Sequence, residues 1–256
     1  MPGTKVSTAI PPSPDGAIVP TSPALLILWD IDHTLIETGG VGSEVYAAAF
    51  QKVTGHKLEQ LAAVSGRTEP VIFRETLALH GLDDPGGLFA RFADEQARGY
   101  ADRISDLQRR GRALPGAARA LDALATRDDA VQSVLTGNTR PSAEIKLRAF
   151  GLDTHLDLDA AAYGTDSDDR ASLVAIARER AARHTGHEFG PQSTLLIGDT
   201  PADVTAARDG HARIIAVASG DFSPADLAEA GATTVLAGLS STAALIAAIY
   251  PAEPGQ

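Results

Sequence analysis

Asp30 and Asp32 stand two positions apart, directly after the apolar run Ala24–Trp29. Two neighbouring carboxylates repel each other unless a cation or a shared proton relieves the repulsion. Mg²⁺ is a hard ion that prefers oxygen ligands, so it would relieve this pair well. Taken by itself, the pair indicates either a metal site with acid–base chemistry or a solvated turn.

A second acidic turn, Gly198–Asp203, follows the apolar run Thr194–Ile197. Its threonine and proline are typical of the N-cap and first residue of a helix, which would fix Asp199 in the turn. Ligands of open parallel sheets bind at the carboxyl ends of the strands, so we expect Asp199 to join the first pair there. For Asp203 the sequence leaves metal ligation and a capping or supporting role open.

Thr136, Gly137 and Asn138 follow a third apolar run, Ala130–Leu135. A hydroxyl, a glycine and free backbone amides at a strand-to-helix turn form a plausible anion-binding site, although these residues could also simply end the strand and form the turn. Lys146 lies in the helix that follows. Its long side chain could reach back to a bound phosphate or remain a solvated surface lysine.

A parallel sheet must position these turns. Five short apolar runs alternate with stretches of helical character: Ala24–Trp29, Ala130–Leu135, Thr194–Ile197, Arg213–Val217 and Thr233–Leu236. Continuous apolar runs are typical of strands that are covered on both faces. The alternation therefore predicts an α/β fold with right-handed crossovers.

The interval from about Glu37 to Arg112 contains amphipathic segments rich in Ala and Leu, but no convincing strand. A βαβ crossover needs only about a dozen residues, so we interpret this interval as an inserted helical domain. Glycines at positions 39, 40 and 42 would suit a hinge at its entrance, and Gly111 and Gly116 one at its exit. Ordinary turns are the alternative for all five.

We predict a three-layer, Rossmann-like α/β core over residues 24–36 and 113–250, with a small helical cap over residues 37–112. Residues 1–23 contain six prolines and no periodic pattern, so we expect a flexible N-terminal tail there, and a short C-terminal tail over residues 251–256.

The composition excludes several classes of function. A net charge of −11 disfavours binding to nucleic acid and to anionic membranes, both of which need clustered basic residues. Without cysteine there is no disulfide framework, thiolate nucleophile or cysteine-ligated metal, and a cytoplasmic location fits. No N-terminal run has the length or flanking charges of a membrane span or a signal peptide.

The three turns resemble the motifs of the haloacid dehalogenase superfamily of phosphohydrolases. Asp30–Leu35 is similar to its first motif, Thr136–Asn138 to its second and Gly198–Asp203 to its fourth. The resemblance extends from about Ala24 to Ala248 and includes a helical cap inserted directly after the first motif.

The resemblance implies that Asp30 attacks phosphorus to form an aspartyl-phosphate, while Asp32 protonates the leaving oxygen and later activates water. It also implies that the Asp30 side chain, the Asp32 backbone carbonyl and Asp199 bind Mg²⁺, with Asp203 in support. Thr136 and a lysine would neutralise the phosphoryl oxygens, and Gly137 and Asn138 would help to bind the substrate.

Two positions in the motifs depart from the family pattern. The segment Thr165–Arg170 lacks the lysine of the third motif, so Lys146 is the candidate for that charge and Arg170 the second choice. Arg170 could also form a salt bridge with Asp166 or Glu179. His33 occupies a position that a smaller residue often fills, where it could tune the turn or cover the metal site.

In the cap, Ser65–Thr68 resembles a substrate-facing loop in relatives of phosphoglycolate phosphatase and β-phosphoglucomutase. Arg67 could bind a substrate anion there, and a surface ion pair with Glu69 is the alternative.

These features predict a Mg²⁺-dependent hydrolase that cleaves phosphate monoesters of small metabolites through an aspartyl-phosphate. The nearest alternative is a phosphosugar mutase of the same superfamily. From a different class, a phospho-accepting or interaction protein without turnover also stays open. We expect a small phosphorylated metabolite as the partner, and a monomer or homodimer.

Overall fold

A computed structural model describes residues 25–84 and 86–251 of the chain. Its central sheet has the strand order β4-β1-β5-β6-β7, and all four strand pairs are parallel. The strands are β1 (Leu25–Trp29), β4 (Ala130–Val134), β5 (Thr194–Gly198), β6 (Arg213–Val217) and β7 (Val235–Leu236). Because β1 lies between β4 and β5, the three turns that carry the motifs lie side by side at the carboxyl ends of these strands.

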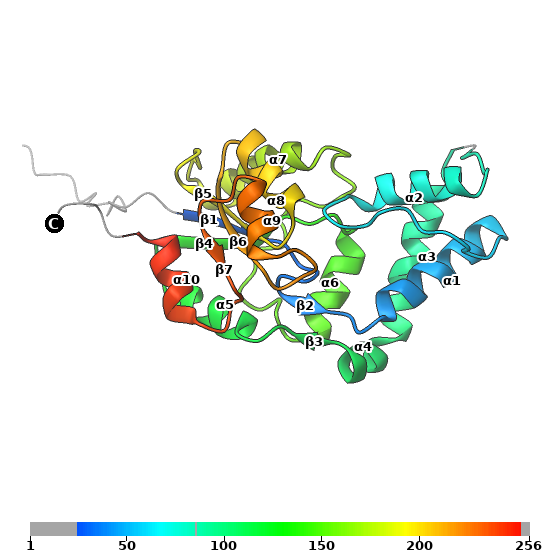
Figure 1. Cartoon of the computed structure of the whole chain (residues 1–256), viewed down its shortest axis with the longest axis horizontal. Coiled ribbons are helices and arrows are strands. Elements are labelled where there is room, and N and C mark those ends of the chain that lie inside the picture. Colours follow the sequence, from blue (N-terminus) through cyan, green and yellow to red (C-terminus); the bar gives the residue numbers. More distant parts are fainter. Residues whose placement is uncertain (1–24, 85, 252–256) are drawn as a thin grey trace, which may run out of the picture.

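Helices cover both faces of this sheet (Figure 1). Leu25, Ile27 and Trp29 point to one face, where α5 (Ala117–Ala125), α6 (Arg140–Ala149) and α10 (Thr242–Ile249) pack. Leu26 and Leu28 point to the other face, where α7 (Arg170–Thr185) and α8 (Pro201–Asp209) pack. The short helix α9 (Pro224–Glu229) packs against β6 and β7 through Leu227. The predicted three-layer α/β core is confirmed.

Four helices form the insertion that stands beside this core: α1 (Val41–Thr54), α2 (Glu69–Leu79), α3 (Leu88–Asp102) and α4 (Ile104–Arg110). Helices α1, α2 and α3 share a separate aromatic core, in which the rings of Phe73 and Phe92 stack with centroids 4.5 Å apart. Burying a large apolar side chain contributes roughly 1.5–3 kcal/mol, so each residue of this cluster helps to stabilise the insertion. The predicted helical insertion is present, whereas its limits at residues 37 and 112 stay a prediction.

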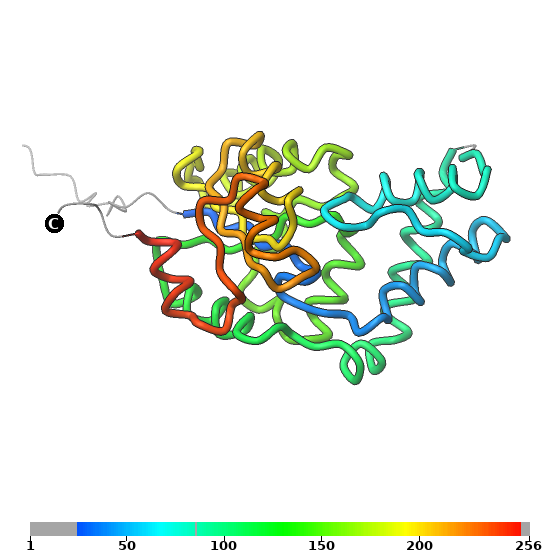
Figure 2. The backbone as a smooth tube through the Cα atoms, viewed as in Figure 1, coloured from blue at the N-terminus to red at the C-terminus, as the bar shows by residue number. Residues whose placement is uncertain are grey.

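The expectation that the interval Glu37–Arg112 contains no strand is wrong at its two ends. Strands β2 (Ile36–Glu37) and β3 (Arg112–Ala113) pair in antiparallel fashion, so the chain leaves the core and returns to it along neighbouring paths (Figure 2). Each strand has two residues, which is too short for an alternating pattern to appear in the sequence.

Close packing accounts for two of the glycines at this crossing. Gly39 has a φ of 60°, and a Cβ atom there would lie 2.2 Å from the carbonyl oxygen of Arg110. A Cβ atom on Gly111 would lie 2.5 Å from the carbonyl oxygen of Glu37. A larger residue would not fit at either position, because the two connecting segments touch there. A hinge at this crossing stays a prediction.

Two further expectations concern the ends of the chain and of the sheet. The last strand is shorter than the predicted run Thr233–Leu236, and the tails predicted for residues 1–23 and 251–256 lie outside the described residues except for Pro251. Among residues 25–84 and 86–251, no helix is long and apolar enough to cross a membrane.

Candidate active site

Asp30 leaves the carboxyl end of β1 in a buried position, where its backbone N–H donates to the carbonyl of Ile197 at 2.9 Å. The turn that follows closes tightly, and His33 adopts a φ of 61° within it. Histidine is among the side chains that tolerate this left-handed conformation. The carbonyl of His33 accepts a hydrogen bond from the hydroxyl of Ser219 at 2.6 Å. Hydrogen bonds therefore hold this turn at Asp30, the candidate nucleophile, and at His33.

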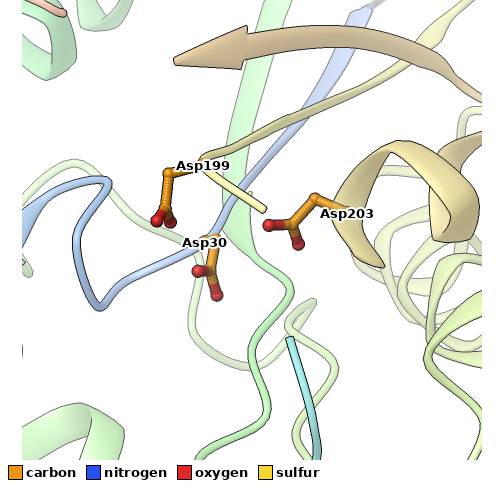
Figure 3. Close-up of side chains that lie close together, drawn as sticks. All are labelled: Asp30, Asp199 and Asp203. Atoms are coloured by element: carbon orange, nitrogen blue, oxygen red, sulfur yellow. The ribbon is translucent and has the colours of Figure 1, made fainter. Parts of the chain in front are cut away.

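Asp199 and Asp203 approach Asp30 from the end of β5 and the start of α8 (Figure 3). One carboxylate oxygen from each of the three residues lies within 4.8 Å of the others. Burial, reinforced by the charge of Asp203, raises the pKa of Asp30 to about 7, against an opposing effect of Arg170. Burial and the charge of Asp30 raise the pKa of Asp199 to about 8. This cluster could hold a metal ion, because a cation would remove the repulsion that these pKa values reflect.

Asp203 has little capacity left for a metal. Its Oδ2 accepts hydrogen bonds from the backbone N–H and the hydroxyl of Thr200, at 3.0 and 2.7 Å, which completes a capping box at the start of α8. Its Oδ1 accepts from Arg170 at 2.6 Å. The geometry thus favours the capping and supporting role over direct ligation.

Arg170, the first residue of α7, is buried between Asp30 and Asp203 and does not point to solvent. Its Nη2 donates to Oδ1 of Asp30 at 2.9 Å as well as to Asp203. The alternative that it pairs with Asp166 or Glu179 is wrong, since Asp166 pairs with Arg180. Burial would lower the pKa of Arg170, but the two carboxylates raise it, so this guanidinium stays charged.

Lys146 is buried on α6 and contacts Asp32. Its ammonium lies 3.0 and 2.9 Å from the two carboxylate oxygens of Asp32 and 2.7 Å from Oδ1 of Asn138. Asn138 in turn donates to Asp32 at 2.8 Å and to Oγ1 of Thr136 at 2.7 Å. Burial raises the pKa of Asp32, but Lys146 and Asn138 outweigh it and bring the pKa below its ordinary value. The solvated-lysine alternative is wrong.

The expected site of free backbone amides after β4 is only partly formed. The N–H of Thr136 donates to Ala162 at 3.1 Å, and the N–H of Asn138 donates to the hydroxyl of Thr136 at 3.3 Å. Gly137 lies against the insertion, since a Cβ atom there would be 2.0 Å from the carbonyl oxygen of Arg67. The turn Thr136–Asn138 therefore offers the site mainly its side chains, because two of its three backbone N–H groups already have partners. Its glycine lies in close contact with the insertion.

Arg67 forms an ion pair with Glu75 and keeps 39% of its side chain exposed. The expected alternative of a pair with Glu69 is wrong. Arg67 lines a cavity of about 240 Å³, which core and insertion residues line together. Asp30, Asp32, Thr136, Asn138 and Asp199 all line this cavity, so the structure brings the predicted residues into one site.

Sequence reasoning overlooked several cavity residues in the insertion. Glu69 begins α2, and Gln96 and Tyr100 lie one turn apart on α3. Nε2 of Gln96 donates to Oε1 of Glu69 at 3.0 Å, and the Lys146 ammonium lies 5.0 Å from the centre of the Tyr100 ring. The spacing of Gln96 and Tyr100 on α3 could have indicated a site, because polar residues one turn apart on the buried side of a helix need hydrogen-bond partners.

The haloacid dehalogenase-like hydrolase family matches residues 27–208, a region that holds every one of these strand-end groups. The chain belongs to the haloacid dehalogenase-like hydrolases. A comparison with curated proteins finds no significant match.

Several solved structures share this fold along nearly their whole length. A hydrolase from Pseudomonas syringae is 23% identical with a TM-score of 0.61, and a predicted phosphoglycolate phosphatase from Haemophilus somnus is 16% identical with a TM-score of 0.63. A Thermotoga maritima protein provisionally named a β-phosphoglucomutase is 17% identical with a TM-score of 0.56. Each comparison covers 88% of this chain and 99% of the other. At these identities the likeness establishes the fold.

Proposed function

We propose that this hydrolase cleaves phosphate monoesters of small metabolites with Mg²⁺ and an aspartyl-phosphate intermediate. The observation that carries the proposal is the convergence of Asp30, Asp32 and Asp199 with two buried cations, Lys146 and Arg170, at the carboxyl edge of the parallel sheet. Carboxylates and fixed cations around one cavity suit phosphoryl transfer, in which catalysis consists mainly of positioning and charge stabilisation.

In the first step, a carboxylate oxygen of Asp30 attacks phosphorus and the bond to the leaving alcohol breaks. Arg170 occupies Oδ1 of Asp30, so Oδ2 is the oxygen available for attack. The leaving oxygen takes a proton from Asp32. In the second step, Asp32 removes a proton from water, the water oxygen attacks phosphorus, and the bond to Asp30 breaks to release inorganic phosphate.

The residues present fit a hard divalent cation. Asp30 and Asp199 offer buried carboxylate oxygens, and burial together with the neighbouring carboxylates raises the pKa of both groups. We propose that these two side chains and the Asp32 backbone carbonyl hold Mg²⁺, with Asp203 acting through Arg170 and Thr200. When bound, Mg²⁺ would neutralise charge on the phosphoryl oxygens and favour the ionised form of Asp30.

Lys146 and Arg170 divide the role of the missing third-motif lysine. Arg170 orients Asp30, while Lys146 lies close to Asp32 and Asn138 and can turn toward phosphoryl oxygens. The lowered pKa of Asp32 keeps this carboxyl group ionised, as the base of the second step requires. For the first step, movement of the ammonium from Asp32 to the phosphate would let Asp32 carry a proton.

The remaining assignments follow from this chemistry. Thr136, Gly137 and Asn138 would contact the phosphoryl group. Residues 37–112 would act as a cap that closes the cavity, with Arg67 near its edge. A cytoplasmic location and a monomeric or homodimeric state remain predictions from the sequence.

A phosphosugar mutase is the second candidate, since a structure provisionally named a β-phosphoglucomutase shares the fold. A mutase would return the phosphoryl group from Asp30 to a sugar hydroxyl instead of to water. Analysis of products from a hexose phosphate separates the two, because a phosphatase releases inorganic phosphate and a mutase gives an isomeric ester.

Phosphate release from a panel of phosphorylated metabolites, with Mg²⁺ or with EDTA, tests the proposal. We expect turnover only with Mg²⁺, its loss in Asp30→Asn, and its retention in Asp128→Asn, which makes the same substitution at an exposed position. Circular dichroism checks that both variants fold. Turnover retained in Asp30→Asn would refute the nucleophile, and a phosphorylated protein that persists without turnover would favour a phospho-accepting protein.

A further inference from the structure

Glu69 is a half-buried carboxylate at the cavity that the proposed mechanism does not use. It is the first residue of α2, and its Oε1 accepts a hydrogen bond from Nε2 of Gln96 at 3.0 Å. Its Oε2 is buried and has no hydrogen-bond partner among the described residues. Because buried polar atoms in native proteins are nearly always paired, this oxygen points to a missing donor.

The neighbours of Glu69 hold its carboxyl group in place. Oε1 of Gln96 accepts from the hydroxyl of Ser142 at 3.2 Å, and Ser142 accepts from the hydroxyl of Thr139 at 3.1 Å. This chain of hydrogen bonds runs from α6 in the core to α2 in the insertion. The terminal torsion of glutamate is broad, so rotation about it can bring Oε2 within reach of a donor in the cavity.

The nearby cations are already paired with other carboxylates. Arg67 contacts Glu75, Lys146 contacts Asp32, and Arg170 contacts Asp30. Among the described cavity-lining residues of α1, α2 and α3, Glu69 is the one carboxylate. A substrate carboxylate beside it would meet a like charge, whereas a hydroxyl or ammonium group would supply the donor that Oε2 lacks.

We propose that Glu69 determines specificity by accepting a hydrogen bond from a hydroxyl or ammonium group on the leaving alcohol of the substrate. This inference rests on the proposed phosphatase function. In the proposed mechanism the phosphoryl group would lie beside Asp30 at the core side of the cavity. Glu69 lies at the side of the insertion, so the selected group would belong to the part of the ester that departs. The cavity of about 240 Å³ has room for a small molecule there.

A series of short esters that differ in one terminal group tests this inference. Ethyl phosphate has no donor, 2-hydroxyethyl phosphate has a hydroxyl, 2-aminoethyl phosphate has an ammonium and phosphoglycolate has a carboxylate, and the three-carbon homologues extend the reach. In the wild type we expect kcat/KM to be about tenfold or more higher for a donor-bearing ester than for its alkyl counterpart, the size of a hydrogen bond to a charged acceptor. The carboxylate esters should be the poorest substrates.

Glu69→Gln replaces the acceptor by a donor of nearly the same shape. We expect it to remove the preference for donor-bearing esters and to raise the relative kcat/KM of the carboxylate esters, while Glu69→Asp keeps the direction of the wild-type preference. Glu59→Gln, the same change at an exposed position of the insertion, should leave the ratios as in the wild type. A thermal melt confirms that each variant folds.

p-Nitrophenyl phosphate separates the two possible failures. If the wild type does not hydrolyse it with Mg²⁺ and hydrolyses no ester of the series, the phosphatase function itself is wrong. If the wild type hydrolyses it but shows no preference for donor-bearing esters, or if Glu69→Gln leaves the ratios unchanged, Glu69 has only a structural role and the inference is overturned.

Discussion

Arg170 donates a hydrogen bond to Asp30 at 2.9 Å although the two residues lie 140 positions apart in the chain. The same guanidinium binds Asp203, so one cation joins the end of β1, the start of α7 and the start of α8. A guanidinium can serve two carboxylates at once because its donors are spread over a rigid plane. In the proposed mechanism this contact fixes which oxygen of Asp30 is free.

Replacing Arg170 by alanine should destabilise the protein strongly. The change leaves Asp30 and Asp203 buried without their cation, and removing one partner of a buried ion pair costs about 3–5 kcal/mol. Urea unfolding measures the free energy, and Arg74→Ala is the control, since Arg74 and its partner Asp168 are largely exposed. Such an exposed pair contributes about 1 kcal/mol or less. Equal stability of the two variants would contradict this account of Arg170.

Lys146→Met should lower kcat/KM by about 10²-fold or more, the range seen when a fixed electrostatic group is removed from an active site. It should also shift the acidic limb of the pH–rate profile to higher pH, because Lys146 lowers the pKa of Asp32 and its removal would raise that pKa. The exposed Lys57, replaced in the same way, should change neither quantity. An unshifted acidic limb would mean that Asp32 titrates independently of Lys146 or does not govern that limb.

Much of the fold could be predicted because buried parallel strands are continuous apolar runs. The buried strand Leu25–Trp29 lies within the predicted run Ala24–Trp29, and the predicted run Arg213–Val217 coincides with an observed strand. The length between the first two runs was enough to predict the helical insertion. Strands β2 and β3 could not be predicted, since two residues carry no periodic signal and their pairing depends on how the insertion returns to the core.

The site could be predicted where the fold itself brings residues together. Asp30 and Asp32 follow β1, and Asp199 follows its neighbour β5, so the order of the strands brings the three residues together. The partners of Lys146 and Arg170 could not be derived in this way, because they depend on how α6 and α7 rotate against the sheet. Glu69 was overlooked for a related reason: at the start of a helix, a glutamate looks like a residue that favours the helix dipole.

The metal-free protein should lose stability as the pH rises from about 4 to about 8. Asp30 and Asp199 have raised pKa values of about 7 and about 8, so in this window the folded protein binds more protons than the unfolded chain. The free energy of unfolding therefore falls, by at most about 1.4 kcal/mol per pH unit for each such group. Urea unfolding in EDTA at several pH values measures the slope.

Asp30→Asn tests the origin of that slope, because an amide at this position does not titrate and also relieves Asp199. The variant should unfold with a smaller pH dependence than the wild type and be more stable at pH 8. Carboxylates with lowered pKa values, such as Asp129 and Asp166, lose their stabilising effect only at lower pH and do not interfere. A slope that is the same in wild type and variant would place the effect outside the acidic cluster.

Mg²⁺ should raise the melting temperature of the wild type at pH 8, because an ion that binds only the folded state stabilises it by mass action. In Asp199→Asn, one repelling carboxylate and one proposed ligand are removed together. We therefore expect this variant to melt at a higher temperature than the wild type in EDTA and to gain much less from Mg²⁺. Asp128→Asn, with its exposed side chain, should behave as the wild type in both conditions. A full Mg²⁺ response in Asp199→Asn would exclude Asp199 as a ligand, whatever its effect on turnover.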